Sequence, residues 1–250
     1  MLTNGVSQYH QRRYSSKDVR WVPGDDENKY IHNMKNHRDL MTYSGWDGER
    51  ADFTYRFNSH GFRAEEFSDE PSVMFLGCSM TMGIGIELEH TWAYKVAQDL
   101  GLKNHNLATG GSSNDACYRL FSHWHRIHKP KIVIHYSPPP ERMEVFDERG
   151  TINNLLPSVV DNVEKNKLYK IWISNEINSA MNEQKNRHAI ELFCMREGIR
   201  YHWLEHHQMF PTDHGFEYDK KSFGRDLLHP GAYWHRNMHK RIMTQLNLGA

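Results

Sequence analysis

Two kinds of hydrophobic pattern alternate along the chain from about residue 71 onward. Short runs that predict buried strands occur at 73–76, 104–108, 131–137 and 199–204. Apolar residues recur at helical spacing in the stretches between and after them, at 91–100, 116–128, over most of 141–198 and after Pro230. Strands that alternate with helices are typical of a parallel sheet covered by helices, so the pattern predicts an α/β fold.

The first 70 residues have a different character, because they lack a strong helical period and are rich in turn-forming residues. Their one strand-like piece is 52–58, in which Phe53, Tyr55 and Phe57 alternate with polar residues. We therefore predict an irregular N-terminal extension over 1–70 that packs on one α/β domain formed by 71–250.

Charge, hydropathy and cysteine content narrow the class of protein. The 250 residues include 31 basic and 31 acidic side chains, a balance that gives no support to a nucleic-acid-binding surface. No apolar run reaches the roughly 20 residues of a membrane-spanning helix, and the first residues lack a signal-peptide pattern. The three cysteines do not make a disulfide framework. These features predict a cytoplasmic protein without membrane or nucleic-acid partners, and they leave its oligomeric state open.

Two distant segments carry candidate chemistry. The strand at 73–76 stops at Gly77 and presents Ser79 at the carboxyl edge of the sheet, where open α/β proteins bind ligands. Asp226 and His229 lie three residues apart on a predicted turn near the C-terminus. A serine becomes a nucleophile when a histidine takes its proton, and a carboxylate on the other imidazole nitrogen orients that histidine. We predict that Ser79, His229 and Asp226 form a catalytic triad.

A glycine-rich loop after the second strand supplies candidate hydrogen-bond donors. The backbone N–H of Ser79 and one from Gly110 or Gly111 are predicted to form an oxyanion hole, since glycine lets the main chain approach the reacting oxygen closely. Cys78 is an alternative nucleophile. Adjacent residues on a turn point in different directions, however, so a small buried thiol is the favoured role for Cys78.

These stretches resemble the sequence blocks of a known family. The segment 77–85 resembles block I of the SGNH (GDSL-type) serine hydrolases, and 106–113 resembles block II, with Gly111 at the oxyanion position. The segment 226–230 is similar to the Asp-x-x-His of block V, and 56–63 resembles a segment found before block I in many members. The resemblance implies a flavodoxin-like three-layer α/β/α fold with a central parallel sheet. It also implies hydrolysis of esters or thioesters through an acyl-serine. The overall pattern of the blocks is similar to that of family members encoded by tailed phages.

Two positions depart from the family's pattern. Cys78 stands where the family usually has Asp, and Ser137 followed by three prolines stands where block III usually offers Gly-x-Asn-Asp. Proline has no N–H, so the third oxyanion donor is expected from Asn114, Ser137 or Arg142, or is missing. The predicted oxyanion donors are Ser79, Gly111, Gly110 and Asn114.

The 18 histidines raise the alternative of a metal site. A group from His202 to His214 is close in sequence, and His235 and His239 share a helix face, but no Cys or Glu completes a recognised zinc spacing. We expect no metal and no cofactor.

The sequence therefore predicts a serine hydrolase that cleaves ester bonds. Small acyl groups on carbohydrate are the favoured substrate class, because the chain is polar and has no apolar stretch suited to lipid. Activity on a wide range of esters or on thioesters is the next interpretation. The altered third block and the long extension motivate an alternative of a different class. In that alternative the chain is a non-catalytic protein of the same fold, such as a virion or assembly component.

Overall fold

A four-stranded parallel sheet forms the centre of the molecule. The computed structural model of the chain describes residues 14–146, 148, 152–156, 167, 169–172, 175–205 and 223–246. The sheet contains β3 (Ser72–Leu76), β4 (Lys103–Asn106), β5 (Ile132–Tyr136) and β8 (Arg200–Leu204) in the order β4-β3-β5-β8. All three strand pairs are parallel. The four predicted strands and the parallel sheet are thus confirmed.

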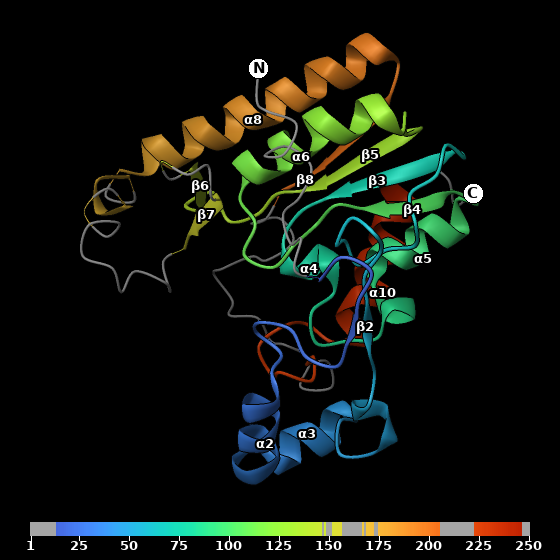
Figure 1. Ribbon diagram of the computed structural model, residues 1–250, viewed down its shortest axis with the longest axis vertical. Coiled ribbons are helices and arrows are strands. Elements are labelled where there is room, and N and C mark those ends of the chain that lie inside the picture. The colour runs from blue at the N-terminus through green and yellow to red at the C-terminus, as the bar shows by residue number, and fades with distance from the viewer. Residues whose placement is uncertain are drawn as a thin grey trace.

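Helices cover both faces of the sheet, as Figure 1 shows. The helices α5 (Trp92–Asp99), which follows the 3-10 turn η3 (Leu88–His90), and α10 (Ala232–Gln245) lie on one face. The helices α6 (Asn114–Ile127) and α8 (Glu176–Glu197) lie on the other. Because side chains alternate along a strand, Val73 and Phe75 pack towards α5 and α10, and Met74 and Leu76 pack towards α6 and α8. The predicted three-layer α/β/α fold is confirmed.

The order of the strands determines where a ligand can bind. The chain runs from β3 out to β4 and then crosses back to β5, so successive strands leave β3 in opposite directions. In doubly wound sheets the crevice at such a switch point, outside the carboxyl ends of the strands, is the usual ligand site. The segments that follow β3, β4 and β5 therefore define the candidate site.

The N-terminal extension contains helices that the sequence pattern did not predict. The strands β1 (Asp18–Val19) and β2 (Tyr55–Arg56) pair antiparallel, and between them lie α2 (Glu27–Asn36), α3 (Arg38–Ser44) and the 3-10 turn η2 (Glu49–Ala51). Asp26 caps α2 by accepting a hydrogen bond from the Lys29 amide, and Gly45 ends α3 in the left-handed conformation. In these two helices only Asn33, Met41 and Ser44 are buried, so an apolar stripe of helical period is absent.

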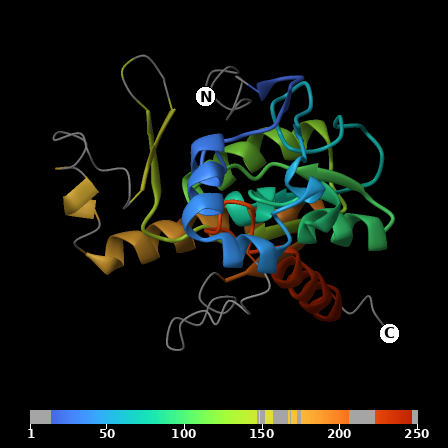
Figure 2. The same ribbon diagram turned by 90° about the horizontal axis from the view of Figure 1, so that it is seen from below.

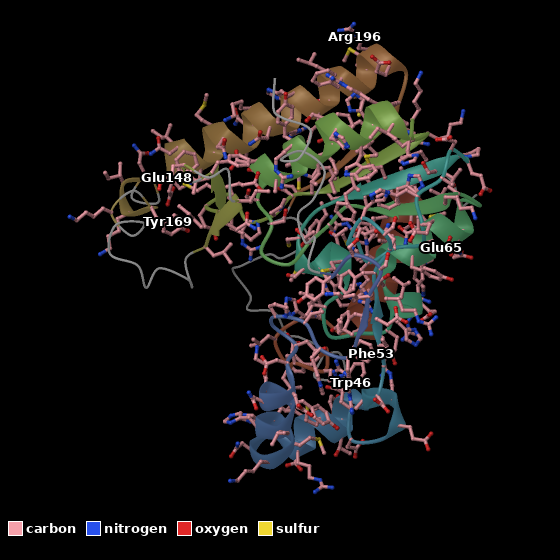
Figure 3. The ribbon with its side chains drawn as sticks, viewed as in Figure 1. Trp46, Phe53, Glu65, Glu148, Tyr169 and Arg196 are labelled. Atoms are coloured by element: carbon pink, nitrogen blue, oxygen red, sulfur yellow. The ribbon has the colours of Figure 1, made fainter. Side chains whose placement is uncertain are left out.

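The extension is joined to the C-terminal part of the chain through the buried side chain of Trp46. Trp46 and Phe53, labelled in Figure 3, have ring centroids 5.9 Å apart. Trp46 Nε1 donates a hydrogen bond of 2.8 Å to the carbonyl of Phe223. The predicted alternation over 52–58 holds for Tyr55 and Phe57, which are buried, although only Tyr55–Arg56 is strand.

The prediction of helix over most of 141–198 is wrong in its first part. The strands β6 (Met143–Phe146) and β7 (Ile152–Leu155) form an antiparallel hairpin, and α8 starts only at Glu176. Figure 2 shows this hairpin standing away from the central sheet. The hairpin places the acidic side chain of Glu144 inside, where it pairs with Arg119 of α6. A charged residue at a buried strand position hides the alternation that a sequence pattern would otherwise reveal.

Among the described residues, no helix is long and apolar enough to cross a membrane. The last predicted helix is confirmed as α10, in which Met238 and Ile242 are buried; Leu246, just after it, completes the stripe.

Candidate active site

Ser79 is the first residue of a short helix that leaves the central strand β3. The helix α4 (Ser79–Met82) begins two residues after Gly77. A Cβ atom on Gly77 would lie 2.2 Å from the Thr81 hydroxyl and 3.1 Å from the carbonyl oxygen of Tyr136. Only glycine therefore lets the strand turn into α4 so tightly, and this turn holds Ser79 at the switch point of the sheet.

Buried side chains hold the carbonyl groups of α4, which a four-residue helix cannot satisfy by itself. The carbonyl of Met80 accepts from Trp92 Nε1 at 3.1 Å, and that of Thr81 accepts from Asn106 Nδ2 at 2.9 Å. The guanidinium of Arg63, 1% exposed, donates to the next two carbonyls and, at 2.7 Å, to that of Ile86. Side chains from α5, from β4 and from the segment before β3 thus fix the short helix that carries Ser79.

The amide of Ser79 is available as a donor. The first N–H groups of a helix have no partner inside the helix, and no side chain caps α4. In the described part of the chain, the Ser79 N–H has no acceptor. The Ser79 side chain is itself largely buried, at 8% exposure. Ser79 therefore lies at the carboxyl end of β3 with an amide that is unpaired within the described residues.

Asp226 and His229 form the predicted pair. Asp226 Oδ2 lies 2.5 Å from His229 Nδ1, and Oδ1 accepts from the amides of Leu228 and His229 at 3.2 and 3.0 Å. Burial by itself raises the pKa of Asp226, but the hydrogen bond and charge of His229, with the two amides, lower it below its usual value. The ionised Asp226 holds the proton of His229 on Nδ1 and leaves Nε2 free to act as a base.

The loop after α4 and the loop of Asp226 are in direct contact. The amide of Arg225 donates to the carbonyl of Gly85 at 2.7 Å, and a Cβ on Gly85 would lie 3.0 Å from Asp226 Oδ1. The amide of Ile84 donates to the Ser79 carbonyl at 3.1 Å. A Cβ placed on Gly24 would lie 3.9 Å from Ile84 Cγ2 and 3.6 Å from His229 Cε1, so both residues lie beside Gly24. Two segments almost 150 residues apart in sequence thus pack together. Ser79 Oγ and His229 Nε2 are not hydrogen-bonded to each other.

A buried ion pair anchors the loop of Asp226 to the N-terminal extension. Arg225 donates to the carboxylate of Asp25 at 2.7 and 3.1 Å, and both side chains are at most 1% exposed. Tyr55 donates to the same carboxylate at 2.5 Å, and its hydroxyl accepts from the Gly85 amide at 2.8 Å. Burial raises the pKa of Asp25, and the Arg225 guanidinium opposes that rise. The sequence analysis missed this anchor, because nothing in the pattern links residues 200 positions apart.

The glycine-rich loop after β4 lies close to the loop that follows Ser79. A Cβ on Gly110 would be 3.1 Å from Ile84 Cδ1, and Gly111 has a positive φ of 72°. Neither glycine amide has an acceptor within the described residues. The loop ends at Ser113, which caps α6. The loop that carries Gly110 and Gly111 therefore lies beside the segment that follows Ser79.

The end of β5 is closed by a polar cluster in place of a conventional third block. Asn114 Nδ2 donates to Ser137 Oγ and to the carbonyl of Pro138, each at 3.3 Å. Ser137 Oγ donates in turn to the carboxylate of Glu183 on α8. Asn114 can serve as an oxyanion donor only by exchanging one of these bonds. Arg142 Nη1 is buried and without an acceptor in the described part of the chain.

The histidines considered as metal ligands have other partners where the structure describes them. His239 Nε2 lies 2.7 Å from Asp99, and His235 Nδ1 accepts from the Trp92 amide at 3.1 Å. Within the described residues, no group of three or more His, Cys, Asp or Glu side chains is arranged to hold a metal. His206, His207 and His214 lie outside the described residues.

Comparison with known proteins adds the following. No protein-family model matches the sequence, and no curated protein matches it. The acetyl xylan esterase Est2A from Butyrivibrio proteoclasticus aligns over 72% of this chain and 65% of its own, with 13% identity and a TM-score of 0.38. The family 3 carbohydrate esterase of Clostridium thermocellum aligns over 70% and 94%, with 12% identity and a TM-score of 0.37. A GDSL-like lipase from Bacteroides thetaiotaomicron aligns over 84% and 100%, with 14% identity and a TM-score of 0.33. These three solved structures are similar to the chain at identities of 12–14% and TM-scores of 0.33–0.38.

Proposed function

We propose that this protein hydrolyses ester bonds through an acyl-serine intermediate on Ser79. One observation carries the proposal: a carboxylate–imidazole pair, Asp226 and His229, packs against the loop that leaves Ser79 at the switch point of the sheet. Asp226 Oδ1 holds its own loop by accepting two amides, while Oδ2 is left to orient the imidazole of His229. A nucleophile at the start of a helix needs such a base.

In the proposed mechanism, Ser79 Oγ attacks the acyl carbonyl carbon while His229 Nε2 accepts the hydroxyl proton. His229 then returns that proton to the leaving alcohol as the ester C–O bond breaks. A water molecule, deprotonated by His229, then attacks the acyl carbon, and the bond from that carbon to Ser79 Oγ breaks as His229 returns the proton to Oγ, which releases the acid. The Ser79–His229 hydrogen bond would form when substrate binds, since catalytic hydrogen bonds are often long in free enzymes.

The negative charge on the carbonyl oxygen would be held by the amides of Ser79 and of Gly111 or Gly110. Asn114 or Arg142 would supply a third donor. In a protease, loss of one such donor lowers turnover by about 10²–10³-fold. Because Asn114 is held by other acceptors, we expect slower turnover than in an enzyme with a dedicated third donor.

Hydrolysis of p-nitrophenyl acetate by the full chain tests this proposal. Wild type and Cys78→Ala should release p-nitrophenol, while Ser79→Ala and His229→Ala should fall to the background rate. Equal rates for wild type and Ser79→Ala would refute the proposal and favour the non-catalytic alternative. Acetylated carbohydrate, the substrate class expected from the sequence, should be compared in the same assay.

A further inference from the structure

The β6–β7 hairpin, together with Ile171, Trp172 and Asn178, lines an open apolar cavity that does not include Ser79 or His229. Its volume is about 390 Å³, well above what an acetyl group would fill. The apolar side chains that line it are Met143, Val145, Phe146, Leu155, Ile171 and Trp172. Phe146 is 42% exposed and Ile171 69% exposed, so large apolar side chains meet solvent here. Contiguous exposed apolar surface of this kind marks a binding site in most soluble proteins.

The hairpin wall of this cavity is firmly tied to the central domain. Glu144 and Arg119 form a two-pronged ion pair at 2.6 and 2.9 Å, and their side chains are 2% and 4% exposed. The amide of Glu144 donates to Asp115, in the first turn of α6, at 3.1 Å. The cavity therefore keeps a fixed position relative to the glycine-rich loop that precedes α6.

The opposite wall is tied to the segment that follows β5. The hydroxyl of Tyr169, labelled in Figure 3 and 2% exposed, donates to the carbonyl of Glu141 at 3.2 Å. Burial raises the pKa of Tyr169 to about 12, so this donor stays protonated at neutral pH. Ile171 and Trp172, which line the cavity, lie two and three residues after Tyr169.

The chain that leaves the cavity wall contacts the proposed oxyanion glycine. Leu156 Cδ1 lies 3.3 Å from the position of a Cβ on Gly111, and the preceding residue, Leu155, lines the cavity. Gly111 is thus in contact with the residue that follows the cavity-lining Leu155. An acyl group whose carbonyl is held at Gly111 could extend towards the hairpin.

We propose that this cavity binds an apolar acyl group longer than acetyl, a medium-length alkyl chain or an aromatic acid, of the ester that Ser79 cleaves. This inference rests on the proposed function and revises the small-acyl expectation drawn from the sequence. Each buried methylene should raise kcat/KM about fourfold, the equivalent of about 0.8 kcal/mol. From acetate to hexanoate, partial burial of four methylenes should give a gain of at least about tenfold.

The test is a series of p-nitrophenyl esters from acetate to octanoate with wild type and three variants. Phe146→Ala and Ile171→Ser remove exposed parts of the cavity, so neither should affect folding. Met195→Ala is the matched control, since Met195 is 72% exposed on α8 and does not line the cavity. Wild type and the control should favour hexanoate. The two cavity variants should lose most of that preference through a lower kcat/KM for hexanoate, while Met195→Ala should match wild type on both acetate and hexanoate.

Three outcomes would overturn the inference, and they differ from one another. Serine-dependent acetate hydrolysis without any gain at longer chains would remove the acyl site and leave the proposed function intact. Absence of hydrolysis for every ester would remove the proposed function and the acyl site with it. Light scattering that shows a wild-type dimer and a monomeric Ile171→Ser variant would make the cavity a subunit interface instead.

Discussion

Removing the carboxylate of Asp25 should weaken the anchor that holds the loop of Asp226. In Asp25→Ala, Arg225 remains at 0% exposure and keeps its hydrogen bonds to the carbonyls of Ala51 and Arg20, but it loses its counter-charge. Tyr55 also loses its acceptor. Breaking a buried ion pair from one side leaves an uncompensated charge, and such changes cost about 3–5 kcal/mol.

That cost is a large part of the stability of a protein domain, which is about 5–15 kcal/mol. For a domain of this size we expect a urea slope near the upper end of about 1–3 kcal/mol per molar. The unfolding midpoint of Asp25→Ala should therefore drop by at least about 1 M urea. Ester hydrolysis should fall as well, because Arg225 directly precedes Asp226.

The exposed pair between Arg20 and Asp52 provides the control. These side chains are 3.2 Å apart but 50% and 71% exposed, and exposed pairs contribute only about 0–1 kcal/mol. Equilibrium urea unfolding of Asp52→Ala should thus shift the midpoint by about 0.3 M or less. If Asp25→Ala shifts the midpoint no more than Asp52→Ala does, the buried pair does not anchor the loop.

Three further predictions concern the turns of the site and the dependence of stability on pH. Gly77→Ala should cost about 1–3 kcal/mol in urea unfolding, because its Cβ would overlap the Thr81 side chain; an unchanged midpoint would contradict the tight turn. Gly111→Ala keeps the backbone N–H but must adopt a positive φ, so it should cost about 1–2 kcal/mol in urea unfolding and lower kcat by displacing that N–H; an unchanged midpoint and an unchanged kcat would contradict the need for glycine at this position. Burial lowers the pKa of His105 to about 4 and that of His135 and of His235 to about 3. These histidines stay neutral in the folded protein while the unfolded chain takes up protons below about pH 6.5, so thermal stability should fall steadily from pH 6.5 towards pH 4. A flat or rising melting temperature over that range would contradict their burial as neutral side chains.

The sequence predicted the elements whose pattern depends on local burial. Every residue of Ser72–Leu76 is buried, and the contiguous apolar run reveals it. The turn at Gly77 and the Asp226–His229 spacing are also local. The position of Ser79 at the carboxyl edge of the sheet and the pairing of Asp226 with His229 could therefore be predicted. The helices α2 and α3 were missed because few of their residues are buried.

Long-range polar contacts could not be predicted. Asp25 and Arg225 are buried as a pair, yet each alone resembles an ordinary surface charge in the sequence. In the same way, the sequence around Glu144 does not reveal its buried partner Arg119 on α6. The pattern therefore predicts helix where the structure has the β6–β7 hairpin. Buried charges of this kind depend on a partner that only the fold supplies.

Covalent labelling by a fluorophosphonate probe tests the central claim most directly. The probe reports an activated serine without any assumption about the natural ester. Peptide mass spectrometry of the labelled wild type should find one adduct on Ser79, retained in Cys78→Ala and lost in both Ser79→Ala and His229→Ala. An adduct on another residue, or wild-type protein that stays unlabelled while correctly folded, would contradict the account.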